Sequence, residues 1–166
     1  MTSEEKIARD GIVGERFPKV AGSSLSGDRV HLPADLAGAP AVLFVAYRRG
    51  TQADIDRWSA FVGREAPDLR SLELPVIPAL VWRPLAALID SGMRGGVPRE
   101  AWSQVVTLYE EGRPLRDFLG DRGGNTAIVV LLDETGVVRW CERAGFEPRR
   151  GRALLGVLAG LAQERS

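Results

Sequence analysis

Few side chains of this sequence are of the types that perform covalent or metal chemistry. Cys141 is its single cysteine and His31 its single histidine. One cysteine excludes an internal disulfide and a CxxC motif, and one histidine excludes a zinc site built on histidines. A Ser-His-Asp triad would depend on His31, whose neighbours RVHLP are typical of the end of a strand. We therefore expect no metal, no other cofactor and no assigned catalytic residue.

Cys141 ends a short strand predicted over residues 137–141. Side-chain alternation in a strand puts Arg139 and Cys141 on one face and Val138 and Trp140 on the other. The thiol is either a redox or inter-subunit disulfide site, or a small, partly buried side chain with ordinary reactivity. The second interpretation is favoured, because no histidine or second cysteine accompanies the thiol to lower its pKa.

A second candidate site is the segment RRGTQAD, residues 48–54, which joins a predicted strand to a predicted helix. Arg48 and Arg49 precede the helix start, where backbone amides point outward, and they either bind an anion or are simply solvated. That anion would be a phosphate, a carboxylate or an acidic segment of a partner. Thr51 is expected to cap the helix, with Asp54 as the acidic half of a capping box. The alternative for Asp54 is a binding or catalytic carboxylate.

Hydrophobic patterning predicts the elements that position these residues. The unbroken apolar run AVLFVAY, residues 41–47, is typical of a strand covered on both faces. From Thr51 to about residue 63, apolar side chains recur every three or four residues, which predicts an amphipathic helix. Further elements are a hairpin over 17–32 with its turn at Gly27, strands over 72–81, 105–109, 126–132 and 137–141, short helices over 84–89 and 114–119, a glycine-rich loop over 90–98, and a final helix over 149–164. The alternation predicts an α/β fold with a mostly parallel sheet, to which the closing hairpin adds antiparallel strands.

The length of 166 residues predicts one domain, over residues 17–166, after a loosely attached lead-in over residues 1–16. The 22 basic and 22 acidic residues cancel, which argues against a nucleic-acid partner and an anionic membrane target. No apolar stretch is long enough to span a bilayer, and the first residues resemble neither a secretory signal nor a transit peptide. We expect a cytoplasmic protein, and the excess of arginine over lysine indicates a GC-rich bacterial genome.

Several stretches of the sequence resemble the peroxiredoxin branch of the thioredoxin-like superfamily, in their order and spacing over about residues 17–164. The resemblance implies a three-layer α/β/α fold with a mixed central sheet, an N-terminal hairpin and a C-terminal helix. The stretches that carry it are Phe17-Pro18, SLSG at 24–27, VHLP at 30–33, the run at 41–47, TLYEEG at 107–112 and VLLDETGVVRW at 130–140.

A second resemblance is to a thioredoxin-like family of mitochondrial ATP-synthase assembly factors. It is carried by GVVRW at 136–140 together with Met93-Arg94. Those proteins share the peroxiredoxin fold and lack a dependable thiol site. This resemblance implies a role in binding or assembling other proteins.

The sequence departs from the thioredoxin-like pattern where the resemblance implies a thiol site. With Thr51 aligned to the peroxiredoxin threonine, Asp54 takes the place of the cysteine, and a carboxylate cannot attack a peroxide or exchange a disulfide. Asn125-Thr126 stands where thioredoxins have a cis-proline followed by threonine. The candidate binding residues are Arg48, Arg49, Gly50, Thr51, Asp54, Asn125 and Thr126, and the candidate redox residue is Cys141.

The function most consistent with these departures is that of a non-catalytic thioredoxin-like module. It would hold an unknown protein partner, as an assembly factor or chaperone, or would pair with a second copy of itself. The alternative is an enzyme: a divergent thiol oxidoreductase or peroxiredoxin-like enzyme that uses Cys141, or chemistry built on Arg48, Arg49 and Asp54.

Overall fold

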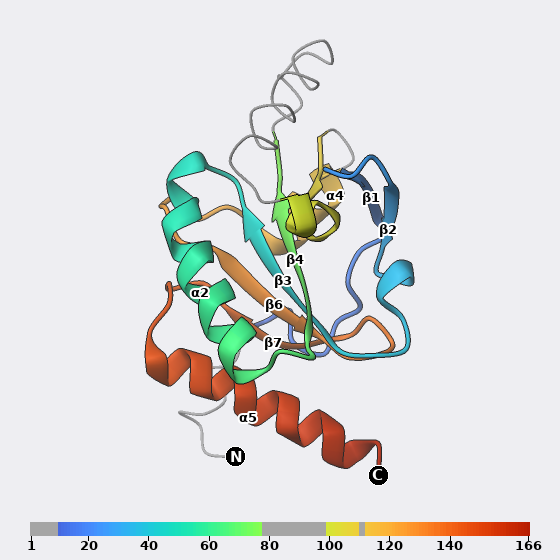
Figure 1. Cartoon of the computed structure of the whole chain (residues 1–166), viewed down its shortest axis with the longest axis vertical. Helices are drawn as coiled ribbons and strands as arrows, with labels where there is room; N and C mark the ends of the chain where they lie inside the picture. The colour runs from blue at the N-terminus through green and yellow to red at the C-terminus, as the bar shows by residue number, and fades with distance from the viewer. Residues whose placement is uncertain (1–9, 78–98, 110–111) are drawn as a thin grey trace.

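The structure, a computed structural model, describes residues 10–77, 99–109 and 112–166. It has the α/β architecture expected from the sequence. Strand β3 (Ala41–Ala46) lies inside a four-stranded sheet of order β4-β3-β6-β7 (Figure 1). β4 (Arg70–Pro75) runs parallel to β3, whereas β6 (Ile128–Leu132) runs antiparallel to both β3 and β7 (Val138–Glu142). The prediction of a mixed central sheet is therefore confirmed.

The N-terminal hairpin is also confirmed. β1 (Val20–Ser24) and β2 (Arg29–Leu32) pair antiparallel. Gly27 turns the chain between them with a φ of +96°, a conformation that glycine adopts without steric cost. β1 also pairs with β5 (Val106–Thr107), which is shorter than the predicted strand over 105–109.

The prediction of a mostly parallel sheet is wrong for the strands that the structure describes. A parallel pair needs a crossover connection, and helix α2 (Gln52–Glu65) supplies one between β3 and β4. Isolated parallel bridges, Glu73 to Val105 and Val76 to Leu108, also connect β4 with the chain around β5. The remaining described ladders are antiparallel.

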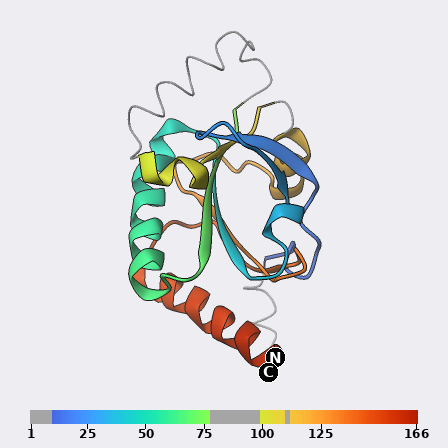
Figure 2. The ribbon, with the colours of Figure 1, turned by 45° about the vertical axis from the view of Figure 1, so that its right-hand side comes forward.

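Helices enclose the sheet on both faces, which confirms the three-layer arrangement. Figure 1 shows α2 and α5 (Pro148–Glu164) on one side of the sheet, and Figure 2 shows α4 (Arg113–Leu119) on the other. Successive side chains of β3 point to opposite faces and so enter two separate cores. Val42 and Phe44 pack with the residues of α2 and α5, whereas Leu43 and Val45 pack with those of α4.

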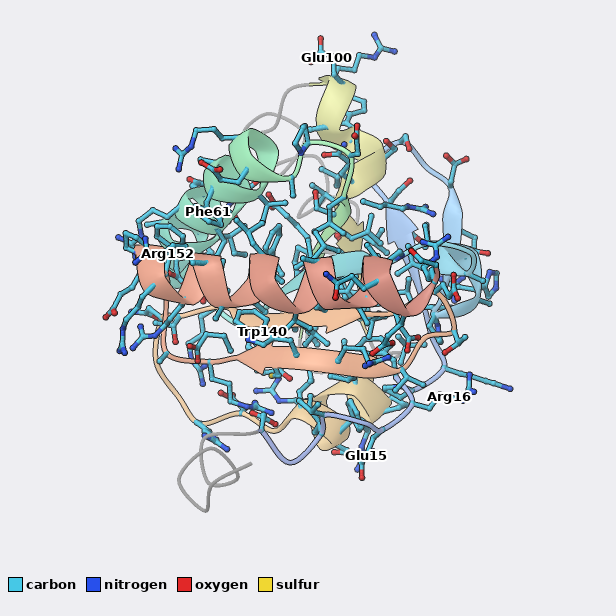
Figure 3. All side chains as sticks on the ribbon, turned by 90° about the horizontal axis from the view of Figure 1, so that it is seen from below. Glu15, Arg16, Phe61, Glu100, Trp140 and Arg152 are labelled. Atoms are coloured by element: carbon cyan, nitrogen blue, oxygen red, sulfur yellow. The ribbon has the colours of Figure 1, made fainter. Side chains whose placement is uncertain are left out.

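Strand β7 contains a β-bulge that changes the predicted orientation of Cys141. Two consecutive residues of β6 pair with Val138 and Trp140, so Arg139 between them is unopposed. Val138 and Cys141 consequently pack against the same core, beside α4, while Trp140 packs in the core under α5 (Figure 3). The prediction that Cys141 and Val138 lie on opposite faces is wrong, because the extra residue interrupts the alternation.

Residues 10–16 pack against the sheet instead of forming a loosely attached lead-in. Ile12 is buried in the core beside α4. The Gly14 amide donates to the Val138 carbonyl at 2.7 Å, and the Val138 amide donates to the Glu15 carbonyl at 2.9 Å. These bonds continue the sheet beyond β7.

Some predicted features lie outside the described residues. They are the helix over 84–89, the glycine-rich loop over 90–98 with Met93 and Arg94, and the last part of the strand predicted over 72–81. In the described part of the chain, no helix combines the length and the apolar character needed to cross a bilayer.

Candidate functional site

The two segments that the sequence singled out meet at one end of β3. After β3 the chain forms the 3-10 turn η2 (Arg49–Thr51) and enters α2. A Cβ atom added to Gly50 would lie 2.8 Å from Cγ of Asn125, so the Asn125 side chain lies directly against the Gly50 backbone. The structure thus brings Gly50 of the first segment beside Asn125 of the second.

Arg48 is tied to a carboxylate that the sequence did not single out. Its Nη1 and Nη2 atoms donate to the two carboxylate oxygens of Asp121 at 2.9 and 2.8 Å. Arg116 donates to the same carboxylate at 2.8 Å, as does the amide of Gly123 at 3.0 Å. The bond from Arg48 is the main reason why the pKa of Asp121 falls to about 2. Arg48 is therefore a positioned cation and not a freely solvated one.

A small pocket opens beside this ion pair, with a volume of about 50 Å³. Arg48, Thr51 and Thr126 line it, so it lies between the two candidate segments. The other lining residues are Tyr47, Asp121, Arg122, Gly123, Gly124, Ile128 and Arg143. Arg49 is exposed and does not line the pocket.

Arg143 forms one wall of the pocket, and hydrogen bonds to other segments of the chain fix its side chain. Its Nε atom donates to Asp10 at 2.7 Å and its Nη1 atom to the carbonyl of Leu119 at 2.6 Å. Thr126 contributes through its hydroxyl, which donates to the Arg143 carbonyl at 2.8 Å. The pocket wall is therefore fixed by bonds to the N-terminal segment and to the end of α4.

Tyr47 has a buried hydroxyl that finds no hydrogen-bond partner among the described residues. The Arg116 guanidinium lies over its ring, 4.7 Å from the centroid. Burial raises the pKa of the Tyr47 hydroxyl to about 12, although the nearby Arg116 charge opposes that shift. An unsatisfied buried hydroxyl is uncommon and needs an explanation.

Asp54 does not cap its own helix, so the capping interpretation is wrong. The carboxylate is 1% exposed and accepts hydrogen bonds from the Ala127 and Phe146 amides, both at 2.8 Å. Thr51 forms no side-chain cap either, because the backbone at Thr51 is already helical and its side chain is buried. Asp54 holds other segments of the chain together and does not line the pocket, whereas Thr51, although largely buried, does.

Cys141 lies in a setting that suppresses thiol chemistry. Its side chain packs against the core beside α4. Burial raises the pKa of the thiol to about 12, and the negative charge of Asp10 acts in the same direction. Because the thiolate is the nucleophile, this environment disfavours attack on a peroxide or a disulfide.

Several pocket residues could not be recognised from the sequence. Asp121 and Arg122 stand in the run GDRGGN, residues 120–125, which has the composition of an ordinary solvated loop. Tyr47 is the last residue of the strand predicted over 41–47, and Arg143 comes two residues after the strand predicted over 137–141. A position at or just after the end of a strand was their one available signal. In the part of the chain that the structure describes, no group of three or more metal-ligating side chains comes together.

Comparison with known proteins supports the fold. No protein-family model and no curated protein matches the chain. Among solved structures, it is similar to the pneumococcal exposed lipoprotein thioredoxin Etrx1 from Streptococcus pneumoniae strain TIGR4. The TM-score is 0.58 at 14% identity, covering 86% of this chain and 99% of that one.

Two further solved structures are similar over most of their length. The thioredoxin domain of the thiol-disulfide oxidoreductase BVU-2223 from Bacteroides vulgatus gives a TM-score of 0.54 at 13% identity, covering 92% of this chain and 96% of that one. BsSco, a member of the Sco family of cytochrome c oxidase assembly proteins, gives a TM-score of 0.61 at 10% identity, covering 92% of this chain and 96% of that one. Identities this low establish a shared fold, so the nearer resemblances to peroxiredoxins and ATP-synthase assembly factors stay predictions. The chain has a thioredoxin-like fold.

Proposed function

We propose that this chain is a non-catalytic thioredoxin-like module that binds a protein partner in an assembly or chaperone role. The observation that carries the proposal is the state of its single thiol. Cys141 is partly buried against the core and its pKa is raised to about 12, and the segment that opens α2 has no sulfur. Burial disfavours the thiolate, which is the form that a thiol enzyme needs at neutral pH.

The positive support for binding is the pocket beside Arg48. Residues 121–126 at its rim are exposed, so a partner can reach it. Arg48 and Arg143 are both held in place by carboxylates, which reduces the conformational entropy lost on binding. A fixed polar pocket on an exposed rim suits recognition of a partner segment.

Assembly work is compatible with this fold, since BsSco is described as a member of a family of assembly proteins. In our proposal the protein acts in the cytoplasm, where a buried thiol stays reduced. A second copy of the chain is the other occupant that we consider for the binding surface. Native mass spectrometry of the purified protein distinguishes a homodimer from a monomer that needs a different partner.

The first test compares the wild type with Cys141→Ser in peroxide-consumption and disulfide-reduction assays. We expect no turnover above the protein-free rate in either sample. Turnover by the wild type that is lost in Cys141→Ser would refute the proposal and favour the thiol-enzyme alternative.

The second test addresses binding directly. Tagged wild-type protein and the variant Arg122→Glu are used in parallel to capture partners from cell extract, with Arg152→Glu as the matched control on α5. Arg122 lines the pocket, whereas Arg152 is exposed on α5 (Figure 3) and is not among the pocket-lining residues. A partner retained by the wild type and Arg152→Glu but lost by Arg122→Glu supports binding at the pocket. Equal capture by all three proteins contradicts it.

A further inference from the structure

The pocket beside Arg48 has a surplus of positive charge. Four guanidinium groups lie in or against it, and they are balanced by two carboxylates, which leaves two positive charges in excess. The four are Arg48, Arg116, Arg122 and Arg143, and the two carboxylates are Asp121 and Asp10. A hollow lined by charges of one sign attracts a ligand of the opposite sign.

The pocket also holds hydrogen-bond donors that the protein does not use. Within the described chain, Arg122 forms no hydrogen bond or ion pair. Arg143 uses Nε and Nη1, and no bond from its Nη2 atom to a described residue is found. The buried hydroxyl of Tyr47 is likewise unpaired in the described structure. The unused donors of Arg122 and Arg143 suit a ligand that accepts hydrogen bonds, which is the property of an anion.

Asp121 indicates which anion fits. The guanidinium group of Arg48 already binds the Asp121 carboxylate through two parallel hydrogen bonds, at 2.9 and 2.8 Å. This planar two-point geometry is the one in which arginine recognises carboxylates. The volume of about 50 Å³ exceeds the roughly 10–15 Å³ that one water needs and accommodates a group of this size.

We infer that the pocket binds a carboxylate carried by an acidic segment of the protein partner, against the repulsion of the protein's own Asp121. The inference rests on the proposed function and specifies the chemistry of the partner. Asp121 both occupies Arg48 and repels an incoming anion. The ligand carboxylate bonds to Arg122 and to the unused nitrogen of Arg143.

The test is an NMR titration of the full chain, observed at the backbone amides of Arg48, Gly123 and Gly124. The probe is a capped peptide, Gly-Gly-Glu-Gly-Gly, and the reference is the same peptide with glutamine in place of glutamate. Sodium acetate and inorganic phosphate are titrated in parallel. We expect saturable shifts with the glutamate peptide and none with the glutamine peptide. Equal affinity for acetate and the glutamate peptide would overturn the inference that the carboxylate belongs to a protein segment. Tighter binding of phosphate would overturn the inference that the bound anion is a carboxylate.

Three variants locate the binding. Arg122→Gln removes a cation that has no partner in the described protein, so we expect it to fold normally and to bind the glutamate peptide roughly tenfold more weakly. Asp121→Asn removes the repelling charge and is expected to bind the peptide several-fold more tightly. Arg152→Gln, on the exposed side of α5, is the matched control and should bind as the wild type does. Unchanged affinity in Arg122→Gln overturns the inference whatever happens to the Asp121 variant.

The two proposals can fail separately. Site-dependent capture of a partner together with no peptide binding leaves the binding module intact and rejects the carboxylate. Thiol turnover that depends on Cys141 rejects the proposed function, whatever the outcome of the titration.

Discussion

The carboxylate of Asp54 accepts a hydrogen bond from the backbone amide of Ala127 at 2.8 Å, across 73 positions of the sequence. Its other oxygen accepts from the amide of Phe146 at the same distance. Asp54 lies in the first turn of α2, Ala127 directly precedes β6, and Phe146 lies in the connection to α5. One buried side chain therefore fixes the start of a helix against two other segments, close to where the candidate pocket is built.

Replacing Asp54 tests this role. Asp54→Ala leaves two amides without acceptors in a buried place, so we expect a loss of roughly 3 kcal/mol in the free energy of unfolding. Asp54→Asn keeps one acceptor oxygen and should lose less. Urea denaturation measures both. The control is Asp56→Ala, an exposed residue of the same helix, which should change stability by no more than about 0.5 kcal/mol. Similar losses at both positions would contradict the role assigned to Asp54.

Gly151 allows α5 to pack closely on α2. A Cβ atom added to Gly151 would lie 2.6 Å from Cε1 and Cζ of Phe61, whose ring is buried. We expect Gly151→Ala to lose about 1–3 kcal/mol of stability through overpacking, although alanine favours helices. Gly156→Ala is the matched control in the same helix, because nothing lies within 4 Å of an added Cβ there. It should gain about 0.5–1 kcal/mol.

Thermal denaturation of the two variants measures the difference between these glycines. In the double variant Gly151→Ala, Phe61→Leu, the smaller side chain at position 61 should relieve part of the clash. The double variant should therefore lose less stability than the sum of the losses of the two single variants. Stabilisation by both glycine substitutions would mean that the helices do not approach as closely as they do here.

The reactivity of Cys141 gives a direct measure of its environment. At pH 8 we expect iodoacetamide to alkylate the native protein at least about 100-fold more slowly than the protein unfolded in urea, because burial disfavours the thiolate. Mass spectrometry of the alkylated chain measures both rates. Equal rates in the two states would indicate an accessible thiolate and would revive the thiol-enzyme alternative.

Local hydrophobic patterns were sufficient to predict much of the fold. The apolar run at 41–47 and the helical spacing after Thr51 predicted β3 and α2. A strand that is buried on both faces has a continuous apolar run, and a helix that is buried on one face has apolar residues every three or four positions. The bulge at Arg139 left no such trace, so the predicted faces of β7 were wrong from that residue onward.

The candidate site was predicted only in part, for a related reason. Arg48 was found because it follows a buried strand, but its partner Asp121 is 73 positions away in a loop without a distinctive pattern. Asp54 was singled out but was expected to cap its helix, because its true partners are backbone amides, which have no signature in the sequence. Long-range polar contacts of this kind depend on tertiary structure that periodicity does not encode.

Tyr47→Phe should stabilise the protein instead of weakening it. The hydroxyl of Tyr47 is buried without a partner in the described structure, so its removal loses no hydrogen bond and avoids a desolvation cost. At pH 7 we expect the free energy of unfolding to stay unchanged or to rise by up to about 1 kcal/mol. A loss of more than about 1 kcal/mol would mean that the hydroxyl has a partner, such as a bound water, that the substitution removes.

The same variant should change how stability depends on alkaline pH. The pKa of Tyr47 is raised from 10.0 in the unfolded chain to about 12 in the folded one. The unfolded chain therefore releases the phenolic proton first, and the contribution of Tyr47 is complete below pH 10 and is lost as the pH rises toward 12. Cys141, with its own raised pKa, contributes to both proteins, so the difference between wild type and Tyr47→Phe isolates the phenol. Urea denaturation from pH 8 upward should show a steeper loss in the wild type, and parallel curves would place the Tyr47 hydroxyl in contact with water.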